Sequence, residues 1–119
     1  MKIAVSSQGT DLDSQIDPRF GRAAYLLIID TVSSEIEVID NAENLNAFKG
    51  AGIQAAAMVS DSGAEVLLTG YCGPNAFKTL QAAGVKVAND VSGTVGDAVN
   101  AFNEGIVSFA ADANVEGQW

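Results

Sequence analysis

The chain has 119 residues, of which 48% are hydrophobic, and its 15 acidic and 6 basic side chains give a net charge of −9. A chain of this length forms one domain and buries about two thirds of the surface that its unfolded form exposes. The negative charge repels nucleic acid and anionic membranes. With no histidine and one cysteine, an internal disulfide, a Ser-His-Asp triad and a closed zinc site of the usual Cys/His kind are excluded.

The distribution of apolar residues also predicts where the protein works. No apolar run in the sequence approaches the roughly 20 residues that a membrane span requires. Residues 1–5 lead into a strand and lack the apolar core of a signal peptide. We therefore expect a cytoplasmic protein that contacts neither a membrane nor nucleic acid.

Hydrophobic periodicity predicts three strands in the first half of the chain. Apolar residues 3–5 form the first strand, and residues 7–22, which are polar and contain glycine and proline, form a long loop. The continuous apolar run 23–30 and the alternating run 35–40 are predicted to pair as a hairpin. Residues 41–50 follow as a second loop.

The second half of the chain alternates between helix and strand. Helices are predicted over residues 53–59, 74–83 and 95–104, and strands over 66–69 and 85–88. Glycines follow the last two helices, as is common at helix ends. Residues 106–119 show no clear pattern, and we expect them to form a C-terminal tail, partly mobile, after a single domain of residues 1–105.

This order of elements predicts an α/β fold with a five-stranded mixed sheet in the order 3-2-1-4-5 and helices on both faces. If only the second strand runs antiparallel, the other four strands end at the same edge of the sheet. The loops at residues 7–22, 41–50, 70–73 and 89–94 then meet there. Ligands in open α/β sheets usually bind at this edge.

Half of the six basic residues fall in the loops predicted to meet at this edge: Arg19, Arg22 and Lys49. In a chain with a large excess of negative charge, this concentration indicates a local site for an anion. Backbone N–H groups would add further donors around three glycines of the same loops, namely Gly50, Gly70 and Gly73.

A competing interpretation gives the two arginines a structural role. Asp11, Asp13 and Asp17 belong to the same loop, and ion pairs with these carboxylates would pin the loop to itself. The two interpretations differ in whether the guanidinium groups are available to a ligand.

The only cysteine lies between two glycines at the junction of a predicted strand and a predicted helix. If the positive end of that helix lowers the pKa of the Cys72 thiol, the thiolate could ligate copper or iron. The alternative is a small buried hydrophobic side chain, which is common for a cysteine outside a disulfide. Met58, at helical spacing from Ile53, is interpreted as core packing rather than as a copper ligand.

Four segments together resemble the dinitrogenase iron-molybdenum cofactor biosynthesis family, and the resemblance extends over residues 1–105. They are residues 3–7 (Ile-Ala-Val-Ser-Ser), 17–23 (Asp-Pro-Arg-Phe-Gly-Arg-Ala), 50–56 (Gly-Ala-Gly-Ile-Gln-Ala-Ala) and 68–77 (Leu-Thr-Gly-Tyr-Cys-Gly-Pro-Asn-Ala-Phe). The chain is most similar to the stand-alone orange protein branch, which carries a molybdenum–copper sulfide cluster. The resemblance implies a ribonuclease H-like fold and a role in holding, protecting or handing on a metal–sulfur cluster.

Such a cluster is a soft polyanion, which requires positive charge, N–H donors and apolar walls. The predicted cofactor-binding residues are Arg19, Phe20, Gly21, Arg22, Lys49, Gly50, Ile53, Gly70, Tyr71 and Gly73, with Cys72 as a candidate metal ligand. The metals implied are molybdenum and copper, with an iron–molybdenum or iron–sulfur precursor as the other possibility. Similar proteins work beside P-loop ATPases of the cluster-assembly type, which are therefore expected partners.

Two other functional classes compete with a cluster carrier. The first is a regulatory or interaction module that uses the same pocket for a phosphate or nucleotide, or binds a partner without a ligand. The second is a nuclease, which the residues oppose because the first strand carries no carboxylate for a two-metal site. We expect a binding protein and not an enzyme.

Overall fold

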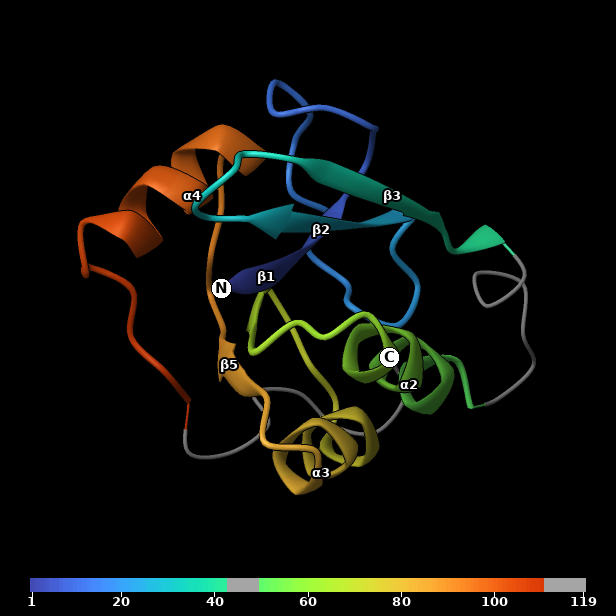
Figure 1. The fold of residues 1–119 in the computed structure, drawn as a ribbon. Helices are drawn as coiled ribbons and strands as arrows, with labels where there is room; N and C mark the ends of the chain where they lie inside the picture. Colours follow the sequence, from blue (N-terminus) through green and yellow to red (C-terminus); the bar gives the residue numbers. More distant parts are fainter. Residues whose placement is uncertain (43–49, 111–119) are drawn as a thin grey trace.

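Five strands form one mixed sheet in the order β3-β2-β1-β4-β5 (Figure 1). The computed structural model describes residues 1–42 and 50–110. The strands are β1 (Lys2–Ser7), β2 (Tyr25–Asp30), β3 (Ile36–Asp40), β4 (Val66–Leu68) and β5 (Lys86–Ala88). Only β2 runs antiparallel to its neighbours, and β4 is parallel to both β1 and β5. The predicted α/β fold, strand order and strand directions are confirmed.

The turn between β2 and β3 is stabilised by the side chain of Asp30, the last residue of β2. The Asp30 carboxylate accepts hydrogen bonds from the N–H groups of Val32 (2.8 Å) and Ser33 (3.2 Å), and these bonds lower the pKa of Asp30. Ser34 adopts a left-handed conformation with φ 65°. The hairpin predicted around residues 31–34 is therefore confirmed.

The second strand begins two residues later than predicted, at Tyr25 rather than at residue 23. Ala24 is apolar, but its N–H donates to the Asp17 carboxylate and its carbonyl accepts from the Asn41 N–H. Because the Ala24 N–H is bonded to the loop that contains Asp17, the regular pairing of β2 with β3 begins at Tyr25 and Asp40. Apolar periodicity alone does not distinguish a residue whose backbone N–H is bonded to a loop side chain from a residue of a regular strand.

Three described helices cover the two faces of the sheet: α2 (Ala51–Asp61), α3 (Pro74–Ala82) and α4 (Val95–Asn103). One apolar core contains buried side chains of α2 and α3, and Met58 packs against it as predicted. A second core contains Val95 and Ala98 of α4. Alternate residues of β1 are divided between these cores, with Ala4 in the first and Ile3 and Val5 in the second. The predicted placement of helices on both faces is therefore correct.

The described part of the predicted C-terminal tail lies along β5. The Ala110 N–H donates to the Val87 carbonyl at 2.7 Å, and the Lys86 ammonium lies 5.4 Å from the centre of the Phe109 ring. Residues 106–110 thus contact the edge of the sheet, whereas residues 111–119 lie outside the described part. None of the helices in residues 1–42 and 50–110 is long and apolar enough to cross a membrane.

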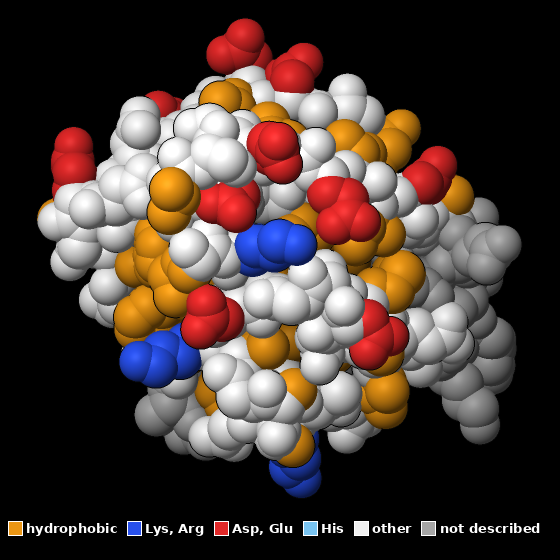
Figure 2. Space-filling model, in the orientation of Figure 1, with side chains coloured by type: hydrophobic (Ala, Val, Ile, Leu, Met, Phe, Trp, Pro, Cys, Tyr) orange, Lys and Arg blue, Asp and Glu red, His pale blue; other side chains and the backbone are white. Residues whose placement is uncertain are grey.

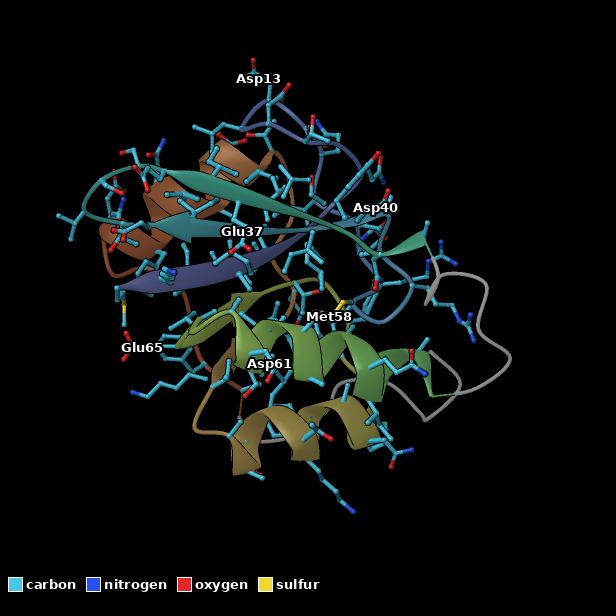
Figure 3. The ribbon with its side chains drawn as sticks, turned by 45° about the vertical axis from the view of Figure 1, so that its right-hand side comes forward. Asp13, Glu37, Asp40, Met58, Asp61 and Glu65 are labelled. Carbon is cyan, nitrogen blue, oxygen red and sulfur yellow. The ribbon has the colours of Figure 1, made fainter. Side chains whose placement is uncertain are left out.

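Acidic side chains are spread over the face that Figure 2 shows, with few basic groups between them. Figure 3 labels Glu37 on β3, Asp61 at the end of α2 and Glu65 just before β4, all of which are exposed. Asp61 and Glu65 lie at the edge where β1 and β4 begin. They are therefore at the opposite edge of the sheet from the loops that carry the two arginines.

Candidate functional site

Two loops meet where β1 and β4 end. We call residues 17–22 the arginine loop and residues 69–73 the cysteine loop. The Phe20 N–H donates to the Tyr71 carbonyl at 3.1 Å, and the Tyr71 N–H donates to the Pro18 carbonyl at 2.6 Å. Arg19 and Tyr71 thereby form a short parallel bridge. The predicted meeting of these loops at the carboxyl edge of the sheet is confirmed.

The arginine loop is held by a buried carboxylate that bonds to backbone groups. Asp17 Oδ1 accepts from the Arg19 N–H and Asp17 Oδ2 from the Ala24 N–H, both at 3.2 Å. Within residues 1–42 and 50–110, no ion pair joins Arg19 to Asp11, Asp13 or Asp17. The exposed Arg19 guanidinium is therefore available to a ligand. The Arg22 side chain is half-buried in the same loop.

Asn41, which is not among the predicted site residues, fixes the far end of the arginine loop. Its buried side-chain amide donates to the Gly21 carbonyl at 3.2 Å and to the Ala23 carbonyl at 2.9 Å. A net contribution of about 1 kcal/mol is typical of such a bond. The signal in the sequence was an amide side chain directly after an alternating strand, at the edge where ligands were expected.

Two glycines of the site allow the backbones of different elements to approach one another. A Cβ added at Gly21 would lie 2.7 Å from Gly52 Cα in α2, and one added at Gly70 would lie 2.8 Å from the Pro18 carbonyl oxygen. Both positions therefore exclude any larger side chain. The space beside Gly70, predicted to admit a ligand, is occupied on this side by Pro18.

The helices α2 and α3 begin at this edge without a side-chain cap. The residue preceding each helix is a glycine, Gly50 or Gly73, and neither helix has an acidic residue in its first turn. The first N–H groups of a helix lack internal partners, and its aligned peptide dipoles place partial positive charge there. The two helix starts therefore favour an anion, together with Arg19.

The predicted apolar wall is divided between the surface and the core. Ile53, in the first turns of α2, is 45% exposed, and Tyr71 is 39% exposed. Phe20 is only 1% exposed and packs in the core beneath the arginine loop. Ile53 and Tyr71 can therefore contact a ligand on the surface, whereas Phe20 supports the loop from below.

Cys72 is fully buried in the core that α2 and α3 share. Its Sγ lies 3.8 Å from the Gly73 carbonyl oxygen. Burial raises the pKa of the thiol from 9.0 to about 12, which is opposite to the lowering that metal ligation by a thiolate requires. Both observations favour the interpretation of Cys72 as a packing residue.

The described part of the site offers anion-binding groups and no set of protein ligands for a metal ion. No group of three or more His, Cys, Asp or Glu side chains that could hold a metal occurs in the described ranges. Lys49, the third basic residue of the predicted site, and residues 43–48 of the predicted second loop lie outside them. The described groups are helix N–H donors, one exposed guanidinium and two apolar side chains.

The chain is similar to proteins of known structure over almost its whole length. The apo form of the orange protein from Desulfovibrio gigas is 49% identical, with a TM-score of 0.93 and 96% of each chain covered. A Thermotoga protein assigned to the DUF35 family is 40% identical, with a TM-score of 0.79 and 91% of each chain covered. A Methanocaldococcus jannaschii protein, 18% identical with a TM-score of 0.68, covers 94% of this chain and 96% of its own and shares the fold.

Comparison with family patterns identifies the same relationship. A comparison with curated protein sequences finds no match. The family described as dinitrogenase iron-molybdenum cofactor matches residues 1–105, which include every described residue of the candidate site. The chain belongs to the dinitrogenase iron-molybdenum cofactor family.

Proposed function

We propose that this protein binds an anionic metal–sulfur cluster at the carboxyl edge of its sheet and carries or protects it without turnover. The observation that carries the proposal is the juxtaposition of two helix starts lacking caps and acidic residues with the exposed guanidinium of Arg19. Family membership supports a ligand related to the iron–molybdenum cofactor. A relative described as an apo form supports a ligand that can be absent from the folded protein.

The chemistry of a sulfide polyanion fits the described residues. Its terminal sulfides accept hydrogen bonds from the first N–H groups of α2 and α3, and Arg19 balances part of the charge. Ile53 and Tyr71 would shield the cluster from water. The cluster is held as an anion, so a ring of protein ligands is not required.

Lys49 and Arg22 complete the proposed charge, and molybdenum with copper is the proposed metal content. An iron–molybdenum or iron–sulfur precursor presents similar sulfides to the same donors. Transfer of the cluster would involve a partner, for which we propose a P-loop ATPase that docks on the acidic face of Figure 2.

The proposal is tested by removing the available guanidinium. Arg19→Ala and the unchanged protein are titrated with tetrathiomolybdate and copper(I), and binding is followed by the charge-transfer absorption of the cluster. Loss of a hydrogen bond to a charged group, about 1.5–3 kcal/mol, predicts at least tenfold weaker binding. The effect should shrink at high salt, because screening weakens the charge interaction at this exposed side chain.

Lys2→Ala is the matched control, because it removes one positive charge at the opposite edge of the sheet. It should leave binding unchanged. Equal binding by Arg19→Ala and the unchanged protein would show that the proposed site is wrong. If inorganic phosphate binds at micromolar concentration while thiomolybdate gives no absorption bands, the site serves a phosphate ligand instead.

A further inference from the structure

Two hydroxyl groups are buried side by side beneath the arginine loop, at the ends of β1 and β4. Ser6 and Thr69 are both fully buried, and their side-chain oxygens lie 2.8 Å apart. Ser6 Oγ also lies 2.7 Å from the Asp17 carbonyl oxygen. Buried hydroxyls without a partner are costly, so the direction of each of these bonds is informative.

The direction follows from counting protons. A carbonyl oxygen only accepts, so the single hydroxyl proton of Ser6 is donated to Asp17. The proton between Ser6 and Thr69 must then come from Thr69. The bonds run in one direction, from Thr69 to Ser6 to Asp17, and link β4 through β1 to the arginine loop. The Asp17 N–H in turn donates to the Ser6 carbonyl at 3.0 Å.

Asp17 connects the two buried hydroxyl groups to the backbone of the ligand site. Its backbone is fixed from both sides by Ser6, and its carboxylate receives the Arg19 N–H. The next residue, Pro18, accepts the N–H of Tyr71 from the cysteine loop. The position of the Arg19 backbone is therefore set by groups at the ends of two neighbouring strands.

We infer that Ser6 and Thr69 are positioning residues, whose buried hydroxyl pair holds the arginine loop against the cysteine loop and so places Arg19 at the site. The effect on ligand affinity rests on the proposed function above, whereas the effect on the loops does not. A hydroxyl is needed at Ser6 because the Asp17 carbonyl requires a donor that an apolar strand residue cannot supply, and the Thr69 hydroxyl in turn supplies the donor for the buried Ser6 oxygen.

Hydrogen exchange of backbone amides in the ligand-free protein tests the inference directly. The Phe20 and Tyr71 amides bridge the two loops, and the Leu27 amide, in the middle of β2, reports on global opening. In Ser6→Ala, exchange at Phe20 and Tyr71 should accelerate roughly tenfold relative to Leu27, which corresponds to one lost bond and an unsatisfied carbonyl. Thr69→Val should show a smaller acceleration of the same two amides.

Thr69→Ser is the control, because it keeps the hydroxyl and should exchange as the unchanged protein does. In the Ser6→Ala background, Thr69→Val should add no further acceleration, since the acceptor of Thr69 is already gone. If Ser6→Ala does not fold, the comparison of Thr69→Val with Thr69→Ser decides. Unchanged exchange at Phe20 and Tyr71, or equal acceleration at Leu27, would overturn the inference.

Tetrathiomolybdate titration of the same variants separates this inference from the proposed function. If both hold, Ser6→Ala weakens binding several-fold and Thr69→Ser does not. If Arg19→Ala leaves binding unchanged while exchange at Phe20 and Tyr71 accelerates in Ser6→Ala, the positioning role is supported and the proposed ligand site is wrong. If Arg19→Ala weakens binding and the hydroxyl variants change neither binding nor exchange, the positioning role is wrong.

Discussion

The start of α4 and the start of α3 differ in what stabilises the partial positive charge and the unpaired N–H groups of a helix N-terminus. Thr94 caps α4: its hydroxyl oxygen accepts from the Asp97 N–H at 3.1 Å, and the Asp97 carboxylate accepts from the Thr94 N–H at 3.2 Å. Helix α3 begins with Gly73 and Pro74, without a side-chain cap or an acidic residue. Thus α4 neutralises its positive end with its own carboxylate, whereas α3, like α2, has no carboxylate in its first turn.

This difference carries a cost in stability for the ligand-free protein. A side-chain cap typically contributes about 1 kcal/mol, and a negative charge in the first turn adds about 0.3–1 kcal/mol. At α3, Pro74 offsets part of the lost stability, because it has no N–H to satisfy and its φ suits the first turn. The uncapped starts of α2 and α3 therefore lower the stability of the ligand-free protein, and the anion proposed above would offset part of that loss on binding.

The largest effect is expected from Gly70→Ala, which separates the start of α3 from the arginine loop. The new Cβ would lie 2.8 and 2.9 Å from the Pro18 carbonyl oxygen and Cα. Backbone atoms cannot rotate away, so we expect a loss of about 3 kcal/mol in the free energy of unfolding, at the upper end for overpacking. Urea unfolding followed by circular dichroism measures this loss.

Gly63→Ala provides the control for the added methyl group. Apart from its two chain neighbours, no residue places an atom within 4 Å of a Cβ at Gly63, and only its φ of +84° opposes the substitution. The expected cost is about 1–2 kcal/mol. Equal losses for the two variants would show that the contact of Gly70 with Pro18 contributes nothing.

A smaller effect is expected from the titration of Cys72, the residue just before the start of α3. Its pKa is about 12 in the folded protein and 9.0 ordinarily. As pH rises above 9, the unfolded chain loses the thiol proton while the folded protein keeps it. The stability that the buried thiol contributes is therefore complete below pH 9 and is lost towards pH 12. At pH 10 the loss is about 1.4 kcal/mol.

The measurement compares the pH dependence of unfolding in the unchanged protein with that of Cys72→Ala between pH 8 and pH 11. The variant should show the shallower decline, because all other ionisable groups are common to the two proteins and their contributions cancel. Parallel profiles would mean that the positive start of α3 offsets burial at the thiol. In that case Cys72 would return as a candidate metal ligand.

Much of this arrangement could be predicted from the sequence because apolar periodicity and strand direction are local signals with global consequences. Three strands followed by alternating helices and strands left few possible topologies. Once the directions were assigned, the loops containing Arg19 and Gly70 had to meet at one edge. The composition of those loops then predicted an anion site.

The rest depended on contacts between residues far apart in the chain. Gly70 excludes a side chain because of Pro18, 52 positions earlier. The alternating pattern near Asn41 does not show to which carbonyl groups its side-chain amide donates hydrogen bonds. The burial of Cys72 depends on how α2 and α3 pack together. For the same reason, the apolar side chain of Ala24 does not reveal that its backbone N–H is bonded to the Asp17 carboxylate.

The smallest effect, and the one that tests the comparison most directly, is expected from Asn75→Asp. Asn75 is an exposed residue in the first turn of α3, and the substitution adds a charge with almost no change in shape. A carboxylate there interacts favourably with the helix start and should raise the free energy of unfolding by about 0.3–1 kcal/mol. It should also weaken tetrathiomolybdate binding several-fold, because it competes with the ligand for the same positive end.

Opposite signs for stability and binding are the diagnostic result, since a substitution that merely damaged the fold would lower both. Asn100→Asp, at an exposed position inside α4, makes the same change in net charge away from the helix starts. It should leave thiomolybdate affinity almost unchanged, because salt screens the interaction between a distant exposed charge and the ligand. If Asn75→Asp stabilised the protein without weakening binding, the start of α3 would be available but unused. The ligand would then depend on α2 and the arginine loop alone.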